Sequence, residues 1–303
     1  MQGQNIQMNK GFTIIYLISL LIFGMNGIVA SFIPLSSSEI VLLRTFFGAL
    51  TLAVAYLILR KKITLFGKRR DLIFMILSGA AMGASWIFLF QAYQESGVSI
   101  ATLIYYCGPI IVMALSPLFF REKFTVPKVV GFIIVAAGCL FLNAGAVLQG
   151  IGGFGLFCSA MSAVLYAVMV ICNKKATNIS GLENTLFQLI FACITVAIFV
   201  GCTSGFSFVM GIQLDIWLWI LLLGVVNTGI GCLLYFSSIG KLPVQSVSVL
   251  GYLEPLSAVI FSAIFLQEIL TPMQIVGAVC IIGGAVLAEI TWKNLKTGKR
   301  NNI

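Results

Sequence analysis

Long apolar runs, each close to the length of about 20 residues that a helix needs to cross a bilayer, fill nearly all of this 303-residue sequence. Short segments that contain charges, glycine or proline separate them. Only 9% of the residues are charged, whereas soluble domains carry about 25%, so this composition cannot form a water-exposed surface. We therefore predict an all-α membrane protein with ten transmembrane helices, at residues 12–32, 39–59, 72–93, 98–119, 127–145, 151–173, 184–203, 216–238, 244–266 and 273–292.

The positions of lysine and arginine predict the orientation of these helices. If ten helices alternate from a cytoplasmic N-terminus, the cytoplasmic segments contain every lysine and arginine except Arg44, which lies within a span. Cytoplasmic loops of membrane proteins carry such an excess of basic residues. We therefore expect a multi-pass protein of the cell membrane, with both termini in the cytoplasm. The net charge of +9 is divided among these short loops, which argues against nucleic acid as a partner.

The two halves of the chain match each other when one is shifted by 146 positions. The matched pairs are Tyr106 with Tyr252, Pro109 with Pro255, Glu122 with Glu268, Gly131 with Gly277, and Gly138 with Gly284. We predict two homologous units, residues 12–145 with helices 1–5 and residues 151–292 with helices 6–10. Because each unit has an odd number of helices, the second is inverted, with Glu122 cytoplasmic and Glu268 external. Inverted repeats are typical of secondary transporters, whose substrate site lies near the bilayer midplane between the repeats.

Each half also resembles the EamA domain of the drug/metabolite transporter superfamily. The motifs are Phe23-Gly24-Met25-Asn26, Leu43-Arg44-Thr45-Phe46, Pro109 with Phe119-Phe120-Arg121-Glu122, and Leu253-Glu254-Pro255 with Glu268. Phe23 stands where the family commonly has tryptophan, and Arg121 and Gln267 stand where it often has glycine. The resemblance covers residues 12–292. It implies a ten-helix fold that moves small metabolites, often amino acids or related compounds and often outward, and it leaves the substrate open.

Glu254 is the first candidate for the transport chemistry, because it lies at the middle of the predicted span 244–266. A charge at the bilayer centre costs about 2.5–3.5 kcal/mol on insertion scales, and ionisable residues there usually mark functional sites. The Glu254 carboxyl could exchange a proton during transport, or it could bind the ammonium group of a substrate. The structural alternative is a protonated carboxyl that is hydrogen-bonded to a neighbouring helix.

Arg44 is the only basic residue in the interior of a predicted span, since Lys128 stands at the very start of the span 127–145. Gly48 and Thr51 follow it at helical spacing, so it belongs to a face of small and polar residues. Its guanidinium could pair with Glu254 or bind a substrate carboxylate. Equally, it could extend outward to the lipid headgroups or pair with Glu39.

Pro109 and Pro255 occupy equivalent positions in the middle of their predicted spans. A proline within a helix removes one backbone hydrogen bond and frees the carbonyl four residues earlier, here that of Tyr105 or Gly251. Gly108 adds flexibility beside the first proline. We predict a pair of hinges, at Gly108–Pro109 and Pro255, whose exposed carbonyls line a substrate cavity. The alternative is a packing kink, which membrane helices tolerate.

A second group of candidates consists of amide and aromatic side chains at membrane depth. Asn227 lies at the centre of a span, where an amide needs partners, and Trp86 and the tyrosines lie deeper than an interfacial belt. A cavity lined by such groups would suit an amphipathic zwitterion, although helix packing alone is the alternative explanation of each. The group comprises Asn26, Trp86, Tyr106, Asn227 and Tyr252, followed by Tyr105 and Tyr166.

Two other classes of protein compete with a transporter. A passive channel or facilitator fits the same sequence. An intramembrane enzyme fits poorly, because the chain has no histidine and its aspartates, Asp71 and Asp215, fall in loops on opposite sides. The eight cysteines lie in apolar runs without metal-ligand spacing, so we expect neither metal nor cofactor. The Gly79–Gly83 pair predicts close helix packing, within the bundle or in a homodimer.

Overall fold

The computed structural model describes residues 10–60, 63–96, 101, 104–121, 126–142, 153–179, 181–265 and 271–297. Throughout these ranges the regular structure is helical and includes no strand. The described helices that are long and apolar enough to cross a membrane are Lys10–Ser31, Ser37–Ile58, Arg69–Ala92, Gly153–Lys175, Leu182–Thr203 and Leu214–Ile239. The predicted all-helical membrane fold is confirmed, and the count of ten spans stays a prediction. Glu122 and Glu268 lie outside the described residues.

Residues 10–142 form one series of helices. In chain order they are α1 (Lys10–Gly24), α2 (Asn26–Ser31), α3 (Ser37–Ile58), the 3₁₀ turn η1 (Leu65–Gly67), α4 (Arg69–Ser96), α6 (Cys107–Phe120) and α7 (Val126–Leu142). The second series contains α9 (Gly153–Lys175), α10 (Leu182–Thr203), η2 (Ser207–Gly211), α11 (Leu214–Leu221), the π-helical segment η3 (Leu222–Ile230), α12 (Gly231–Ile239), α13 (Val244–Leu250), α14 (Leu253–Phe265) and α15 (Pro272–Thr297).

The two predicted proline hinges coincide with helix breaks, but the breaks precede the prolines. A turn at Tyr106 comes before α6, and a turn at Gly251 and Tyr252 separates α13 from α14. Pro109 and Pro255 each lie in the first turn of the following helix, where a missing N–H costs no intrahelical bond.

The expected free carbonyl at Gly251 is wrong, because this oxygen accepts the amide N–H of Glu254 at 3.1 Å. The predicted span 12–32 is broken as well, at Met25, where α1 ends and α2 begins. The predicted spans 12–32 and 244–266 are therefore pairs of shorter helices, and the span 98–119 is interrupted at Tyr106.

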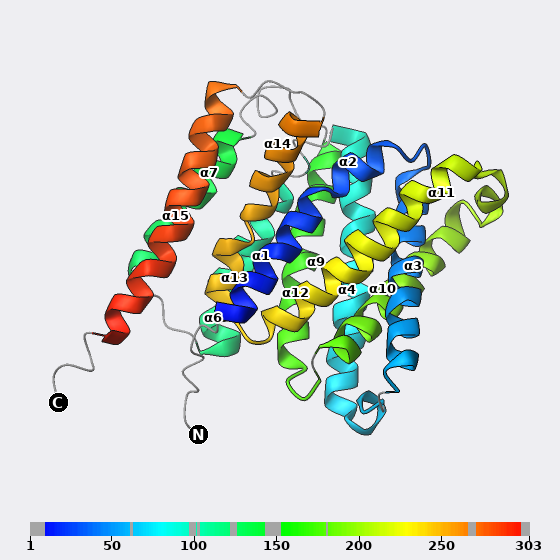
Figure 1. Ribbon diagram of the computed structural model, residues 1–303, viewed down its shortest axis with the longest axis horizontal. Helices are drawn as coiled ribbons and strands as arrows, with labels where there is room; N and C mark the ends of the chain where they lie inside the picture. Colours follow the sequence, from blue (N-terminus) through cyan, green and yellow to red (C-terminus); the bar gives the residue numbers. More distant parts are fainter. Residues whose placement is uncertain are drawn as a thin grey trace.

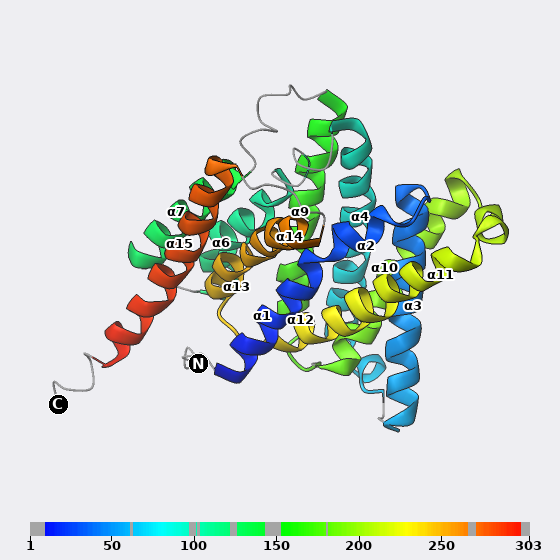
Figure 2. The same ribbon diagram turned by 45° about the horizontal axis from the view of Figure 1, so that its top comes forward.

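Helices from equivalent parts of the chain pack against one another. α7 and α15 lie side by side at one edge of the bundle (Figure 1, Figure 2). A Cβ atom added at Gly138 would lie 2.8 Å from the Gly277 carbonyl oxygen, and one added at Gly284 would lie 2.6 Å from the Gly131 carbonyl oxygen. These four glycines are two pairs separated by 146 positions, so each contact is repeated with the two helices exchanged.

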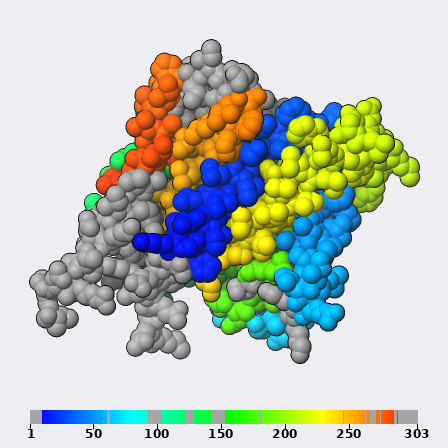
Figure 3. Space-filling model, in the orientation of Figure 1, coloured from blue at the N-terminus to red at the C-terminus, as the bar shows by residue number. Residues whose placement is uncertain are grey.

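The rest of the bundle follows the same plan. α4 packs against α9 and α10, while the equivalent segment, η3 with α12, packs against α3 and α1. α6 packs on α9, and in the same way α14 packs on α1. Figure 3 shows this second contact at the surface, with α1 lying between α14 and the α11–α12 segment.

The predicted glycine face of α4 makes its close contact within the chain. An added Cβ would lie 2.9 Å from the Gln188 carbonyl oxygen at Gly79, and 2.7 Å from the Ala192 carbonyl oxygen at Gly83. Both partners are on α10. Small residues let membrane helices approach in this way, so the Gly79–Gly83 face holds the bundle together; a homodimer stays a prediction.

Replacing Gly284 by alanine is expected to lower the thermal stability of the purified protein, because the added methyl would clash with the Gly131 carbonyl and separate α7 from α15. Overpacking of this kind costs about 1–3 kcal/mol. Gly283 is the matched control, since an added Cβ there meets no atom within 4 Å. Thermal unfolding in detergent should show a lower midpoint for Gly284→Ala and not for Gly283→Ala. Equal midpoints would contradict the close contact.

Candidate functional site

Arg44 is buried in the middle of the bundle, with only 4% of its surface exposed. Its Nε donates a hydrogen bond to Thr228 Oγ1 at 3.0 Å, and its Nη2 lies 3.5 Å from Asn26 Oδ1, at the long limit for such a bond. Its Cζ lies 4.4 Å from the centroid of the Trp86 ring, within the range of a cation–π interaction. The guanidinium therefore points inward, and the interpretation that it extends to lipid headgroups is wrong. Glu39 accepts the Ser36 amide N–H at the start of α3.

The π-helical segment η3 positions both polar partners of Arg44: Thr228 belongs to it, and Asn26 is bonded to its Asn227. The sequence did not predict a π-helix here. Thr228 Oγ1 donates to the Leu223 carbonyl, five residues earlier, at 2.8 Å. Asn227 Nδ2 donates to Asn26 Oδ1 and to the Ile22 carbonyl, both at 3.1 Å. The centre of the predicted span 216–238 thus contacts the break between α1 and α2. Such π-helical segments occur frequently at functional sites.

Glycines on both sides allow η3 to approach α3 closely enough for these bonds. A Cβ added at Gly48 would lie 2.9 Å from Thr228 Cγ2, and one added at Gly224 would lie 2.6 Å from Phe47 Cβ. Larger residues at either glycine would separate the helices and lengthen the bond between Arg44 and Thr228.

Glu254 lies in the first turn of α14 and is half-buried. The N–H groups at the start of a helix carry partial positive charge, which favours a carboxylate at this position. Its carboxyl is close enough to interact electrostatically with the Arg44 guanidinium and with the phenols of Tyr16 and Tyr166. The structure thus brings Glu254 near the Arg44 cluster, which we define as Arg44, Asn26, Trp86, Asn227 and Thr228.

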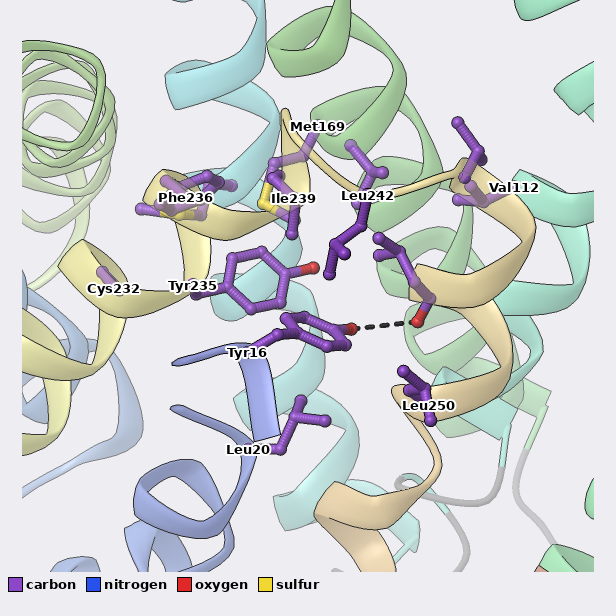
Figure 4. Packing of buried hydrophobic residues seen from close by; sticks show 14 of the residues in the cluster. Tyr16, Leu20, Val112, Met169, Cys232, Tyr235, Phe236, Ile239, Leu242 and Leu250 are labelled. Carbon is purple, nitrogen blue, oxygen red and sulfur yellow. Dashed lines mark hydrogen bonds between the residues drawn. The ribbon is translucent and has the colours of Figure 1, made fainter. Parts of the chain in front are cut away.

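Tyrosine side chains fill the space beside Glu254. Tyr16 and Tyr235 have ring centroids 5.5 Å apart, and apolar side chains such as Leu20, Ile239 and Leu250 surround them (Figure 4). The Tyr235 hydroxyl lies 3.1 Å from the hydroxyl of Tyr166 on α9.

The row continues from Tyr166 toward the two helix breaks. The ring of Tyr105 lies 5.5 Å from that of Tyr166 and 5.7 Å from that of Tyr106. The Tyr106 ring lies 6.1 Å from that of Tyr252. Tyr105 and Tyr106 therefore both belong to the row, in which each ring borders the next. We refer to Tyr16, Tyr235, Tyr166, Tyr105, Tyr106 and Tyr252 as the tyrosine row.

Two hydroxyls of this row bind carbonyls next to helix breaks. Tyr252 Oη donates to the carbonyl of Tyr106 at 2.7 Å, and Tyr16 Oη donates to the carbonyl of Val247 in α13 at 2.9 Å (Figure 4). A backbone carbonyl without a partner in hydrocarbon costs several kcal/mol. The Tyr252 phenol thus joins the two helix breaks, whereas Tyr16 is a second donor to the Val247 carbonyl, which also accepts the Gly251 amide N–H at 2.9 Å.

Sequence reasoning missed Tyr16, Tyr235 and Thr228. The two tyrosines lie near the ends of their predicted spans, where tyrosine is common in the interfacial belt. Thr228 resembled the many threonines that bond back to their own helix, as Thr45 does to the Val41 carbonyl at 2.8 Å. Only the adjacency of Thr228 to Asn227 could have indicated a polar contact.

A second polar cluster was also missed. Asn173, Asn184 and Gln188 are all buried, and their amides bond to each other at 2.9–3.2 Å between α9 and α10. Gln188 Nε2 also lies 3.9 Å from Met82 Sδ on α4. The position 146 residues after Arg44 is Ile190, so the buried cation has no basic counterpart there in the second half.

At one end of the bundle, polar side chains form hydrogen bonds between the segment before α4 and the α9–α10 connection. The Glu183 carboxylate accepts the amide N–H groups of Thr64 and Leu65 at 2.6 and 2.8 Å. Asp71, predicted to lie in a loop, is 2% exposed in the first turn of α4 and accepts Asn178 Nδ2 at 2.8 Å. These bonds tie the segment before α4 to the segment between α9 and α10.

Two grooves of about 250 Å³ lie on the outside of the bundle. One lies between α3 and α10 and is apolar, lined by Phe46, Leu50 and Ile194 among others. The other lies between α6 and α9. Neither is lined by Arg44 or Glu254. Across the described residues, no three His, Cys, Asp or Glu side chains group as metal ligands.

The apolar helices, interhelical polar contacts and broken spans define a multi-pass α-helical membrane protein. The EamA-like transporter family model matches residues 11–144 and again residues 153–289. The chain belongs to this family and is a membrane transporter.

Two curated relatives have transporter descriptions. An uncharacterized transporter, YxxF, of Bacillus subtilis (strain 168) is 27% identical over 287 residues, which cover 94% of this chain and 90% of that protein. An uncharacterized transporter of Archaeoglobus fulgidus is 27% identical over 199 residues, 65% of this chain and 69% of the relative. A solved structure titled "Crystal structure of protein" has a TM-score of 0.77 at 20% identity, covering 95% of this chain and 99% of the other, so the two share a fold.

Replacing Arg44 by lysine is expected to destabilise the protein although the charge is kept. Lysine cannot reproduce the Nε bond to Thr228 or the planar stacking on Trp86, and a hydrogen bond to a charged group contributes about 1.5–3 kcal/mol. Thermal unfolding in detergent should therefore show a lower midpoint for Arg44→Lys. Lys241→Arg, at an exposed loop position, is the control. An unchanged midpoint for Arg44→Lys would mean that the positive charge alone, and not the guanidinium geometry, stabilises the protein.

Proposed function

We propose that this protein is a secondary transporter that moves a small amphipathic zwitterion, an amino acid or a related compound, out of the cell by alternating access. The observation that carries the proposal is the proximity of Glu254 to Arg44, beside a row of tyrosines. A carboxyl and a guanidinium are complementary to the ammonium and carboxylate of such a substrate. Aromatic faces also attract ammonium groups and cover apolar side chains.

The substrate would be bound by residues from both halves. Glu254 and Tyr252 offer a carboxyl and a phenol at the start of α14. Trp86 and Tyr106 would contact the apolar part of the substrate. Asn26 and Asn227 hold one another at 3.1 Å beside Arg44, so they position the guanidinium and supply amide groups to the same region.

The internal repeat explains how the substrate site would open to one side of the membrane and then to the other. The family model matches the two halves separately, and the mirrored glycine contacts of α7 and α15 support two inverted units, residues 12–145 and 151–292. In an inverted repeat, the opposite-facing state forms when the two units exchange conformations. The bond from Tyr252 Oη to the Tyr106 carbonyl would then be replaced by its mirror image, from Tyr106 Oη to the Tyr252 carbonyl.

The helix breaks are the hinges of this exchange. Gly108 and Pro109 begin α6, and Pro255 lies at the equivalent place in α14. An added Cβ at Gly108 would lie 2.7 Å from the Tyr166 ring, so movement of this hinge alters the tyrosine row directly. The breaks allow each half-helix to tilt without disrupting an intact ladder of hydrogen bonds.

Purified protein in liposomes, tested with a panel of radiolabelled amino acids, distinguishes a carrier from a channel or facilitator. A carrier gives saturable flux that unlabelled substrate on the opposite side accelerates. Flux that does not saturate and shows no exchange would favour the passive channel. The panel can be chosen by asking which toxic amino-acid analogues cells survive when they overproduce the protein.

Replacing Glu254 by glutamine should leave the protein folded but reduce exchange of the best substrate by about tenfold or more, since a charge-assisted hydrogen bond of about 1.5–3 kcal/mol is lost. The pH dependence of this exchange should weaken as well. The matched control is Glu95→Gln, which removes an exposed carboxylate that bonds Gln91 at the far end of α4. Full, pH-dependent exchange by Glu254→Gln would eliminate Glu254 as the substrate or coupling residue.

A further inference from the structure

The outer groove between α6 and α9 differs from an ordinary lipid-facing surface. Its volume is about 250 Å³, and apolar residues of α6 and α9 line most of it, among them Leu115, Val164 and Val168. Val164 and Val168 are 45% and 39% exposed, so the groove opens outward, toward the lipid. At one end its lining includes a cation, Lys175.

Basic groups gather at that end of the groove. Lys175 Nζ lies 4.5 Å from the centroid of the Phe119 ring and 5.9 Å from that of Phe74. The guanidinium carbon of Arg70 lies 5.7 Å from the same Phe74 ring, so the two cations flank one aromatic side chain. Arg121 follows α6 directly and is exposed.

Among the described residues, the polar groups next to these cations in sequence have other partners. Asp71, adjacent to Arg70, is 2% exposed and accepts a hydrogen bond from Asn178. Lys174, adjacent to Lys175, turns inward and donates to the carbonyls of Ile239 and Leu242, both at 2.6 Å. One lysine therefore holds the α12–α13 connection, while the next faces the groove.

We infer that this groove is a binding site for an anionic phospholipid. One acyl chain lies in the apolar groove along α6 and α9, and the phosphate of the headgroup contacts Lys175 and Arg70. A guanidinium binds phosphate through paired hydrogen bonds, and basic pockets between transmembrane helices are a known way of holding anionic headgroups. A zwitterionic phospholipid binds less well, because its own cation lies near Arg70 and Lys175.

Native mass spectrometry of the full-length, delipidated protein tests the inference without any transport assay, so its outcome is separate from that of the proposed transport. Dioleoyl-phosphatidylglycerol should be retained as one tightly bound molecule, about tenfold more tightly than dioleoyl-phosphatidylcholine. The double variant Arg70→Gln, Lys175→Gln should lose this preference. Lys241→Gln is the control for loss of a surface cation, because Lys241 is exposed and lies away from the groove, in the α12–α13 connection that Lys174 binds.

A second variant separates a groove from a merely basic surface. Val168→Trp fills the groove and leaves every charge in place, so it should weaken phosphatidylglycerol retention about as much as the double variant does. Retention unchanged by Val168→Trp, or lowered equally by Lys241→Gln, would overturn the site. Millimolar inorganic phosphate should not displace the lipid, and displacement would mean that the basic end binds a free anion.

Discussion

The need to satisfy backbone hydrogen bonds in a medium without water governs this structure. The predicted spans 12–32, 98–119 and 244–266 are each interrupted, and backbone groups at an interruption need partners inside the bundle, because the bilayer offers none. The breaks at Tyr106 and Tyr252 therefore lie against one another inside the bundle, where the Tyr252 hydroxyl binds the Tyr106 carbonyl at 2.7 Å. Tyr16 adds a second hydrogen bond to the Val247 carbonyl of α13, which also accepts the Gly251 amide N–H. The tyrosine row therefore connects the helix pieces of the two halves through hydroxyl–carbonyl bonds.

The same constraint accounts for the environment of the charges. A guanidinium within a bundle persists only where hydrogen bonds and aromatic faces replace its water. Arg44 has a hydroxyl from η3, an amide from the α1–α2 break and the ring of Trp86. In the second half, the position equivalent to Arg44 is Ile190, and the buried polar cluster between α9 and α10 consists of neutral amides that bond to each other. This difference makes the centre of the bundle electrostatically asymmetric, which is the arrangement that the proposed zwitterionic substrate needs.

Several of these features follow from the sequence alone. Apolar length fixes the helical membrane class, and the matched glycines at 131, 138, 277 and 284 indicated the repeat, while their close packing between α7 and α15 emerged only from the structure. Arg44, Asn26, Trp86 and Asn227 were each identified by depth and type, and the structure brings them into one cluster.

Other features were hidden for physical reasons. Proline is compatible with the first turn of a helix, so Pro109 and Pro255 indicated breaks whose positions, a few residues earlier, depend on tertiary contacts. A π-helical turn leaves the apolar pattern unchanged, so η3 and the role of Thr228 could not be inferred from hydropathy. Tyr16 and Tyr235 resembled interfacial tyrosines, since nothing local shows that another helix presents a carbonyl nearby.

The central claim is that two homologous halves of opposite orientation meet at the Tyr106–Tyr252 contact. Gly67 and Gln213 are equivalent positions 146 residues apart, and both are exposed. The most direct measurement replaces each in turn by cysteine, in a protein whose native cysteines have been removed, and labels intact cells with a membrane-impermeant maleimide. The account predicts labelling of Gln213→Cys from outside, and labelling of Gly67→Cys only after the cells are opened. Labelling of both positions from the same side would contradict the inverted repeat and, with it, the proposed exchange of conformations.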